Sequence, residues 1–189
     1  NNEINIPVDG KIPLNKDKEA VQAFFKENVQ PNTKKFDTFK DHIDFLIDGD
    51  YIEKPVIDKY PLSFIEDLYH DLLDQHFQFQ SFMAAYKFYN QYALKTNDGD
   101  LYLENYEMRI LFNALLYANG DQDLAKALAT EMIAQRYQPA TPSFLNAGRK
   151  RRGEYVSCFL LQVTDDMNSI GRTVNSALQL SRIGGGVGI

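Results

Sequence analysis

The chain has 189 residues, of which 44% are hydrophobic and 24% charged, a composition typical of a globular protein that buries a core. Its formal net charge is −6, so no overall positive field would gather a nucleic acid or attract an anionic membrane surface. A single cysteine excludes an internal disulfide framework, and the sequence shows neither a membrane-length apolar run nor a signal-peptide pattern. We therefore expect a cytoplasmic protein without nucleic-acid or membrane partners.

The first part of the chain divides into an arm and a helical domain. Residues 1–15 are polar, carry turn signals at Asp9-Gly10 and Pro13, and are predicted to form an extended arm. Residues 16–138 are predicted to be mostly helical, because apolar side chains recur there at helical spacing. The helical stretches are 16–28, 36–47, 61–75, 81–92, 104–118 and 124–133. After a turn at Thr96–Asp100, the alternation in Leu101–Leu103 predicts one arm of a small hairpin.

The pattern changes at residue 139, where we place a domain boundary. Pro139 and Pro142 forbid a continuing helix and favour extended backbone. Residues 156–163 are apolar on nearly both faces, which predicts a strand covered on both sides. A helix then follows, capped by Asp165 or Asp166, and its apolar stripe consists of Met167, Ile170, Val174, Ala177 and Leu178. Residues 184–189 lead into a further strand, which makes 139–189 a parallel α/β unit.

Cys158 lies in the middle of the predicted strand and allows two interpretations. A lone cysteine on a strand is more often a small buried hydrophobe than a functional group. The functional alternative is a thiol that donates hydrogen and electrons to a substrate and ends as half of a disulfide. That chemistry requires a second cysteine on a neighbouring strand.

Several other residues carry weak signals of ligand binding. Thr141 and Ser157 are hydroxyls of the kind that bind phosphate, although such residues more often satisfy nearby backbone. The glycines at 184–186 and 188 allow a close approach of backbone to a ligand or relieve a crowded turn, and they match neither dinucleotide nor phosphate-loop fingerprints. Ligands of parallel α/β units bind at the carboxyl ends of strands, where Asp165 is placed, although an N-cap is its simpler role.

Charged and aromatic clusters point to structure more than to chemistry. Arg149–Arg152 is the one dense basic patch, and such a patch is more often a solvated loop than a guide for a polyphosphate. The three histidines, His42, His70 and His76, show no metal-ligand spacing, so we predict no metal site. The aromatic residues of 82–92 are more typical of a helix core than of a stacking platform.

Taken in order, these motifs resemble the large, catalytic subunit of class Ib ribonucleotide reductase. The similarity is carried by Thr141-Pro142-Ser143-Phe144-Leu145-Asn146-Ala147-Gly148, Arg152-Gly153-Glu154, Ser157-Cys158-Phe159-Leu160, Asp165, Ser169-Ile170-Gly171-Arg172, Asn175-Ser176-Ala177 and Gly184 to Gly188. It extends to Ser81–Tyr89 and Gln135–Pro139 in the helical region, and so covers nearly the whole chain. It implies a mainly α chain, in which a helical N-terminal domain leads into the first strand and helix of a ten-stranded α/β barrel.

The resemblance also implies roles for individual residues. Cys158 matches the redox-active thiol that reduces the ribose 2′ position and pairs with a second cysteine from a later barrel strand. Thr141, Ser157 and Gly186 match positions that contact the nucleoside diphosphate substrate. Asp165 matches a contact to the allosteric specificity nucleotide, a deoxyribonucleoside triphosphate or ATP.

Partners follow from the same resemblance. The helix at 167–182 resembles one that packs across a homodimer interface. A separate, metal-containing small (beta) subunit would supply the radical, a glutaredoxin- or thioredoxin-like protein would supply electrons, and no cofactor would bind in this chain. The enzyme would make deoxyribonucleotides for DNA replication. The radical cysteine and the other catalytic residues are expected beyond Ile189, so the 189 residues alone should be inactive.

Two other functions compete with this reading. A helical protein-interaction module would use Cys158 only for packing, bind a protein partner and ignore nucleotides. A stand-alone redox protein would have a reactive thiol of low pKa, and burial of Cys158 in a strand argues against it.

Overall fold

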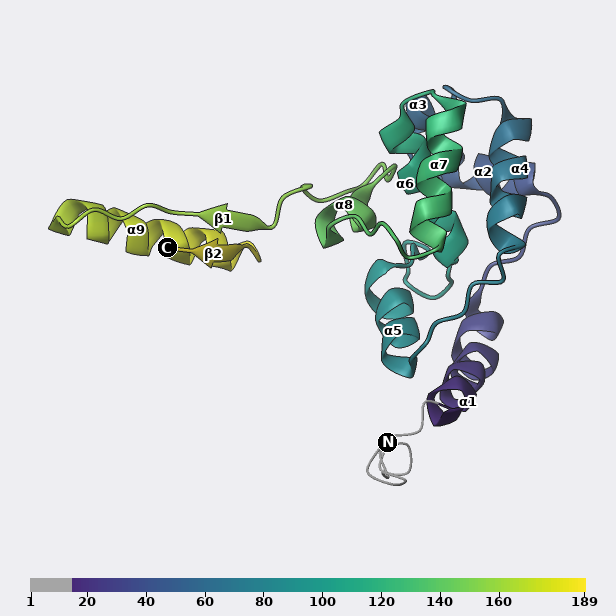
Figure 1. Cartoon of the computed structure of the whole chain (residues 1–189), viewed down its shortest axis with the longest axis horizontal. Coiled ribbons are helices and arrows are strands. Elements are labelled where there is room, and N and C mark those ends of the chain that lie inside the picture. The colour runs from purple at the N-terminus through teal and green to yellow at the C-terminus, as the bar shows by residue number, and fades with distance from the viewer. Residues whose placement is uncertain (1–14) are drawn as a thin grey trace. The chain divides into compact units, whose positions relative to one another are not determined.

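The computed structural model describes residues 15–189, which form two compact units (Figure 1). The first unit extends to Gln138 and includes Ala147–Arg151, and the second unit comprises Pro139–Asn146 and Arg152–Ile189. The extended arm predicted for residues 1–15 lies outside the described residues except for Asn15, which is helical. No helix among residues 15–189 has the length and apolarity needed to cross a membrane.

The first unit is helical, as the apolar spacing predicts. Its elements are α1 (Asn15–Phe24), η1 (Phe25–Val29), η2 (Gln30–Asn32), α2 (Phe39–Asp48), α3 (Lys54–Ile57), α4 (Leu62–Leu73), α5 (Phe82–Lys87), η3 (Phe88–Tyr92), α6 (Tyr106–Ala118) and α7 (Gln122–Ile133). Each predicted stretch contains a helix, but two of them, 16–28 and 81–92, change from α to π geometry at η1 and η3. The short helix α3 was not predicted.

Polar side chains begin four of these helices. The side-chain oxygens of Thr38, Ser81, Asn105 and Asp121 each accept a hydrogen bond from the backbone N–H three residues further on. Such caps satisfy backbone donors that have no partner inside the helix. Asp121 in this way caps α7.

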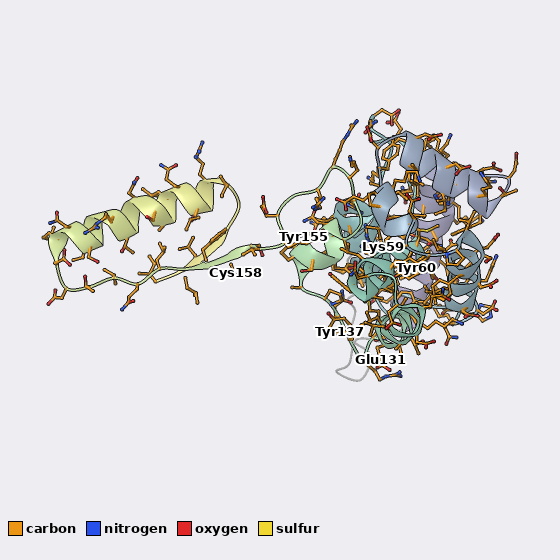
Figure 2. All side chains as sticks on the ribbon, turned by 90° about the horizontal axis from the view of Figure 1, so that it is seen from above. Lys59, Tyr60, Glu131, Tyr137, Tyr155 and Cys158 are labelled. Atoms are coloured by element: carbon orange, nitrogen blue, oxygen red, sulfur yellow. The ribbon has the colours of Figure 1, made fainter. Side chains whose placement is uncertain are left out.

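Helix α6 forms the centre of the first unit. It packs against α3, α4 and α7 (Figure 1). Most of its side chains are buried. Tyr60 fixes the end of this helix, because its hydroxyl donates to the Leu115 carbonyl at 2.8 Å and accepts from the Gly120 N–H at 2.7 Å. Figure 2 labels Tyr60 beside Lys59, whose ammonium donates to the Asn119 side chain. Residues before α4 and after α6 are thereby joined.

A buried charge cluster lies next to α6. Glu104 and Arg109 have side chains with no exposed surface and face each other at 3.4 Å. Glu104 also pairs with Arg149, which in addition donates to the Tyr92 carbonyl. The interpretation of Arg149–Arg152 as one solvated basic patch is therefore wrong for Arg149. Its guanidinium is neutralised inside the unit, whereas residues 150–152 are exposed.

The loop Ala147–Arg151, which carries Arg149, is anchored in the first unit by its backbone. The Glu53 N–H donates to the Gly148 carbonyl at 2.8 Å, and the Lys150 N–H donates to the Tyr51 carbonyl at 3.1 Å. Arg109 donates to the Ala147 carbonyl from the other side. These bonds explain why five residues that follow α8 in the chain belong to the helical unit.

The hairpin predicted around Leu101–Leu103 is present only as a single antiparallel bridge between Lys95 and Tyr102. Tyr102 also forms a parallel bridge with Thr33, at the end of η2. The residues around this turn thus tie together segments of the helical unit without forming a strand.

His42 is a half-buried histidine that we expect to make stability depend on pH. Its ring stacks on Phe36 with 4.2 Å between centroids. Its Nε2 lies 2.7 Å from the Leu103 carbonyl oxygen, and because that oxygen can only accept, Nε2 donates the hydrogen bond. Burial lowers its pKa below the ordinary value of 6.5. The unfolded chain therefore takes up a proton at a higher pH than the folded chain does. The free energy of unfolding should fall as pH decreases through 6.5 toward the folded-state pKa.

Urea unfolding at a series of pH values measures this effect. The His42→Gln variant should lose the part of the pH dependence that lies below 6.5. The same substitution at exposed His76 should leave the pH dependence unchanged. If wild type and His42→Gln have identical pH profiles, His42 is not the source of the pH dependence of the free energy of unfolding.

The second unit contains the predicted strand, helix and strand. Its elements are α8 (Thr141–Asn146), β1 (Cys158–Leu160), α9 (Met167–Arg182) and β2 (Gly186–Gly188). The two strands are parallel, with Cys158 opposite Gly186 and Leu160 opposite Gly188, and α9 contacts β2 (Figure 1). The helix stop predicted before Pro139 agrees with the structure, in which residues 137–140 are not helical, but the extended backbone predicted up to Pro142 is wrong for Thr141 and Pro142, which begin α8. A proline is well accommodated in the first turn of a helix, where its missing N–H has no partner to lose.

The burial predicted for the first strand is also wrong. The strand has three residues instead of the eight of 156–163, and Cys158 is exposed, as are Val156 at 60% and Leu160 at 89%. The strand pairs only with β2 among the described residues, so little covers its two faces. Four members of the apolar stripe on α9, namely Met167, Ile170, Val174 and Leu178, are likewise exposed.

Candidate functional site

Three of the predicted site residues meet where β1 and β2 begin. Cys158 lies opposite Gly186 in the parallel pair, and the Gly186 N–H donates to the Ser157 carbonyl at 2.7 Å. The hydroxyl oxygen of Ser157 lies 4.0 Å from the sulfur of Cys158. Figure 2 shows Cys158 on β1. The pairing of two short strands thus brings a thiol, a hydroxyl and a glycine backbone together from positions up to 29 residues apart (157 to 186).

The glycine run that leads into β2 is required by its geometry. Gly184 has a φ of +90°, a conformation that side chains other than glycine rarely adopt. At Gly185, a Cβ atom would lie 2.4 Å from the ring of Phe159 and 3.1 Å from the Leu180 carbonyl. The run therefore serves a tight return from α9 to β2, and the backbone of Gly186 stays accessible beside Cys158.

A pocket of about 410 Å³ adjoins these residues within the second unit. Its lining includes Thr141 and Asn146 of α8, Ser157 just before β1, and Gly184 and Gly185. Thr141 and Ser157, which lie 16 residues apart in the chain, thus face one space (141 to 157). Two hydroxyls and glycine backbone provide hydrogen bonds to an anionic or hydroxylated ligand. Cys158 is exposed beside the pocket.

Asp165 lies at the opposite end of the strand pair. The helix cap is Asp166, whose carboxylate accepts from the Ser169 N–H at 2.8 Å and from the Thr164 hydroxyl at 2.7 Å. The Thr164 hydrogen bond lowers the pKa of the Asp166 carboxyl. Asp166 lines a second pocket of about 300 Å³ together with Arg172. Asp165 is exposed and is not among the lining residues, so its contact with a nucleotide stays a prediction.

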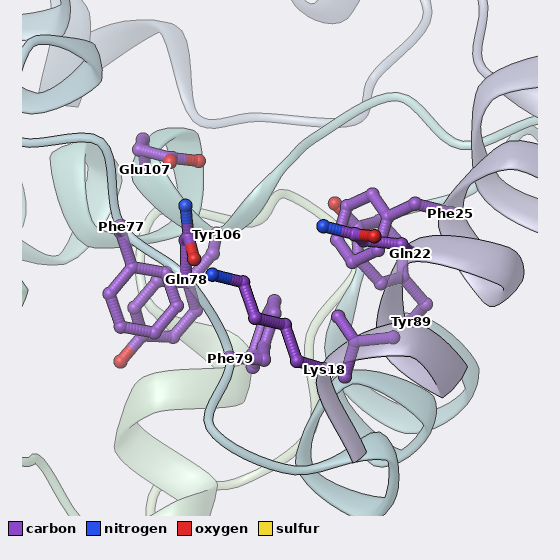
Figure 3. Close-up of a pocket in the computed structure, with 10 residues that line it drawn as sticks. Lys18, Gln22, Phe25, Phe77, Gln78, Phe79, Tyr89, Tyr106 and Glu107 are labelled. Carbon is purple, nitrogen blue, oxygen red and sulfur yellow. The ribbon is translucent and has the colours of Figure 1, made fainter. Parts of the chain in front are cut away.

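A third pocket, which none of the predicted site residues lines, lies in the helical unit (Figure 3). It measures about 260 Å³, and Phe25, Phe77, Phe79, Tyr89 and Tyr106 supply its aromatic lining. The rings of Phe25 and Tyr89 lie 5.3 Å apart and come from the two π-helical turns, which spacing rules for α-helices do not reveal.

Glu107 and Lys18 provide the charges around this third pocket, and burial raises the pKa of the Glu107 carboxyl. Residues 77–79, aromatic at alternate positions between two helices, were the one signal in the sequence that pointed to it.

Among the described residues, no group of three or more histidine, cysteine, aspartate or glutamate side chains could hold a metal ion. The candidate site itself consists of the Cys158 thiol and the hydroxyls and backbone groups around it.

Comparison with known proteins gives matches along the whole chain. Residues 1–77 match a family model described as ribonucleotide reductase N-terminal, residues 78–152 match the all-alpha domain of ribonucleotide reductase, and residues 156–189 match its barrel domain. The chain is 49% identical, over all of its 189 residues, to the alpha subunit of ribonucleoside-diphosphate reductase from Bacillus subtilis, of which it covers 27%. It is 49% identical over 173 residues to the alpha subunit from Mycoplasma genitalium, a match that covers 92% of this chain and 24% of that protein. The chain thus spans about a quarter of the length of these relatives.

Proposed function

The chain belongs to the large-subunit family of the ribonucleotide reductases, and we propose on that premise that it forms part of an enzyme that reduces ribonucleoside diphosphates to 2′-deoxyribonucleoside diphosphates. The observation that carries the proposal is the meeting of Ser157, Cys158 and Gly186 at the start of the strand pair. The pocket beside them includes Thr141 and has the hydrogen-bonding groups that a diphosphate or a ribose needs.

In the proposed reaction, Cys158 and a second cysteine elsewhere in the whole protein act as a pair. The two thiols become a disulfide, the ribose 2′ C–O bond is replaced by C–H, and the hydroxyl leaves as water. The two thiols together supply two electrons and two protons, which balance this change. The position of Cys158 between Ser157 and Phe159, which both line the pocket, suits this role, because a thiol that reduces a substrate must be reached by it.

We propose that residues 16–138 are the helical N-terminal domain and that 139–189 begin the catalytic barrel. Supporting this division, the chain separates into compact units at Gln138 and Pro139, although the loop Ala147–Arg151 remains with the helical unit. The parallel order of β1, α9 and β2 is the order in which an α/β barrel begins.

The remaining partners are proposed from the family. A separate small subunit supplies the radical that starts the reaction, a glutaredoxin- or thioredoxin-like protein reduces the disulfide, and a deoxyribonucleoside triphosphate or ATP binds near Asp165. We propose a cytoplasmic location, because the reaction starts from the thiol form of Cys158, which reducing compartments maintain.

The exposed stripe on α9 supports a homodimer through this helix. Met167, Val174 and Leu178 expose between 54% and 81% of their surface, and large apolar side chains gathered on one helix face mark an interface more often than they face water. In the whole protein, the double variant Val174→Asp, Leu178→Asp should raise the dimer dissociation constant by about 100-fold or more, because it buries two unpaired charges.

Analytical ultracentrifugation measures this dissociation. The variant Gln179→Asp, which adds a charge at an exposed position away from the stripe, is the matched control and should stay dimeric. A double variant that remains as dimeric as the control would show that α9 does not form the interface.

The proposed activity is tested with the full-length protein that carries this sequence, its small subunit, a dithiol and an allosteric nucleotide. Ribonucleoside diphosphates should be converted to the deoxy products, and conversion should stop when the small subunit or the dithiol is omitted. Absence of deoxyribonucleotide from all four diphosphates under these conditions would refute the proposal.

The comparisons favour this function over the helical interaction module. For the stand-alone redox protein, the argument from a buried Cys158 is wrong, since the thiol is exposed. What favours the reductase over a stand-alone redox protein is the match of all three parts of the chain to one family.

A further inference from the structure

We propose that Asn146 is a positioning residue for the substrate pocket, whose side chain holds the helix that carries Thr141 against the segment that carries Ser157 and Cys158. The inference rests on the proposed function, because it assigns the pocket beside Cys158 to the substrate.

The evidence begins with the two hydrogen bonds of the Asn146 carboxamide. Asn146 is the last residue of α8 and is 8% exposed. Its Oδ1 accepts from the Gly153 N–H at 3.0 Å, and its Nδ2 donates to the Glu154 carbonyl at 3.1 Å. One side chain therefore binds two successive residues of the irregular segment that leads to β1.

The path of the chain explains why this link matters. Between Asn146 and Gly153, the loop Ala147–Arg151 leaves the second unit and is held in the first by Glu104, Arg109 and the backbone around Ile52. Helix α8 precedes this loop in the chain, and the segment that leads to β1 follows it. The Asn146 carboxamide joins these two segments directly, across a gap of seven residues (146 to 153).

The position of Asn146 in the pocket connects this link to the substrate groups. Asn146 and Glu154 both line the pocket of about 410 Å³, as do Thr141 at the start of α8 and Ser157 before β1. Thr141 is five residues before Asn146, and Ser157 is three residues after Glu154. Loss of the two bonds would let the hydroxyls of Thr141 and Ser157 move relative to each other while the Cys158 thiol stays in place on β1.

The two hydrogen bonds at position 146 require a side chain that can both accept and donate. A carboxamide offers an acceptor and a donor at one end, and both are used here. An aspartate of the same size can accept from Gly153 but cannot donate to the Glu154 carbonyl as a carboxylate. Asn146→Ala loses both bonds, and Asn146→Asp loses one, so the two variants form a graded pair.

The test measures KM and kcat for a ribonucleoside diphosphate in the full-length enzyme with its small subunit. Asn146→Ala should raise KM about tenfold through loss of two hydrogen bonds, Asn146→Asp should raise it by a smaller factor, and kcat should change less than about threefold in both. In the same variants, the diphosphate should protect Cys158 from alkylation by iodoacetamide only at correspondingly higher concentration.

Asn90→Ala is the matched control, because the Asn90 carboxamide is exposed and donates within its own helical segment to the Tyr86 carbonyl. It should leave KM unchanged. A KM within about twofold of the wild type in both Asn146 variants, or a fall in kcat with KM unchanged, would overturn the positioning role. If Asn146→Ala does not fold, the KM of Asn146→Asp decides alone. An inactive wild type would instead refute the proposed function.

Discussion

Replacement of Cys158 by serine should reduce turnover of the full-length enzyme with a dithiol to background, a loss of at least about 1,000-fold. A serine hydroxyl cannot form a disulfide, so the substrate loses the source of two electrons. The substitution changes one atom at an exposed position, which leaves the hydroxyls of Thr141 and Ser157 and the backbone of Gly186 unaltered. The dissociation constant of the ribonucleoside diphosphate should therefore stay within about threefold of the wild type.

Steady-state turnover and equilibrium binding, measured on the same preparation, separate these two effects. Leu160→Ser is the control, because it places a serine on the same three-residue strand at a side chain that is 89% exposed. Its turnover should remain near the wild-type value if perturbation of β1 is not the cause. Turnover at the wild-type rate in Cys158→Ser would show that this cysteine is not part of the redox pair.

A second large effect is expected at Glu104, on stability. In Glu104→Gln, the buried guanidinium groups of Arg109 and Arg149 would both lose the carboxylate with which they pair. Removal of one member of a buried ion pair typically costs about 3 to 5 kcal/mol, because the remaining charge is neither hydrated nor neutralised. A loss of that size is a large part of the free energy of unfolding of an ordinary domain.

Urea unfolding of the 189-residue chain, followed by circular dichroism, measures the loss. The control is Asp44→Asn, which breaks an ion pair with Lys40 between side chains that are 50% and 65% exposed. Solvent screens such a pair, so the unfolding midpoint should move little. Equal shifts in the two variants would mean that the cluster around Glu104 contributes no more than a surface pair.

The sequence predicted the helices well, because their positions depend on local spacing. The apolar positions of 104–118 repeat at helical intervals, and α6 is found there with its cap at Asn105. The π geometry at Phe88–Tyr92 was not predicted. A single wider turn inside a helix has no characteristic residue types, so the sequence of 81–92 has the pattern of an ordinary α-helix. The start of α8 was missed because Pro142 stops a preceding helix and equally begins a new one.

The candidate site was predictable in its parts but not in its surroundings. The resemblance pointed to Thr141, Ser157, Cys158 and Gly186, and the structure brings the last three together in space. The resemblance did not indicate that Asn146 links the segments that carry these residues. Asn146 binds backbone atoms of Gly153 and Glu154, and any residue type at 153 and 154 provides such atoms, so the link leaves no pattern in the sequence.

Burial depends on distant residues and was the least predictable property. Arg149 looked like part of an exposed basic patch, yet its partner Glu104 lies 45 residues away in the chain (104 to 149). Cys158 looked buried, because an apolar strand usually has covered faces, but exposure depends on what packs against the strand rather than on the strand itself.

The path of the loop Ala147–Arg151 has a practical consequence for dissection of this protein. A gene truncated after Gln138, at the boundary that the prolines suggest, would encode all of α1 to α7 but would lack Arg149. The carboxylate of Glu104 would keep one guanidinium partner instead of two, and the carbonyl of Tyr92 would lose the hydrogen bond from Arg149. An autonomous helical fragment should therefore extend to Arg151, so that limited proteolysis of the whole chain yields a more persistent product from cleavage after residue 151 than from cleavage at 138.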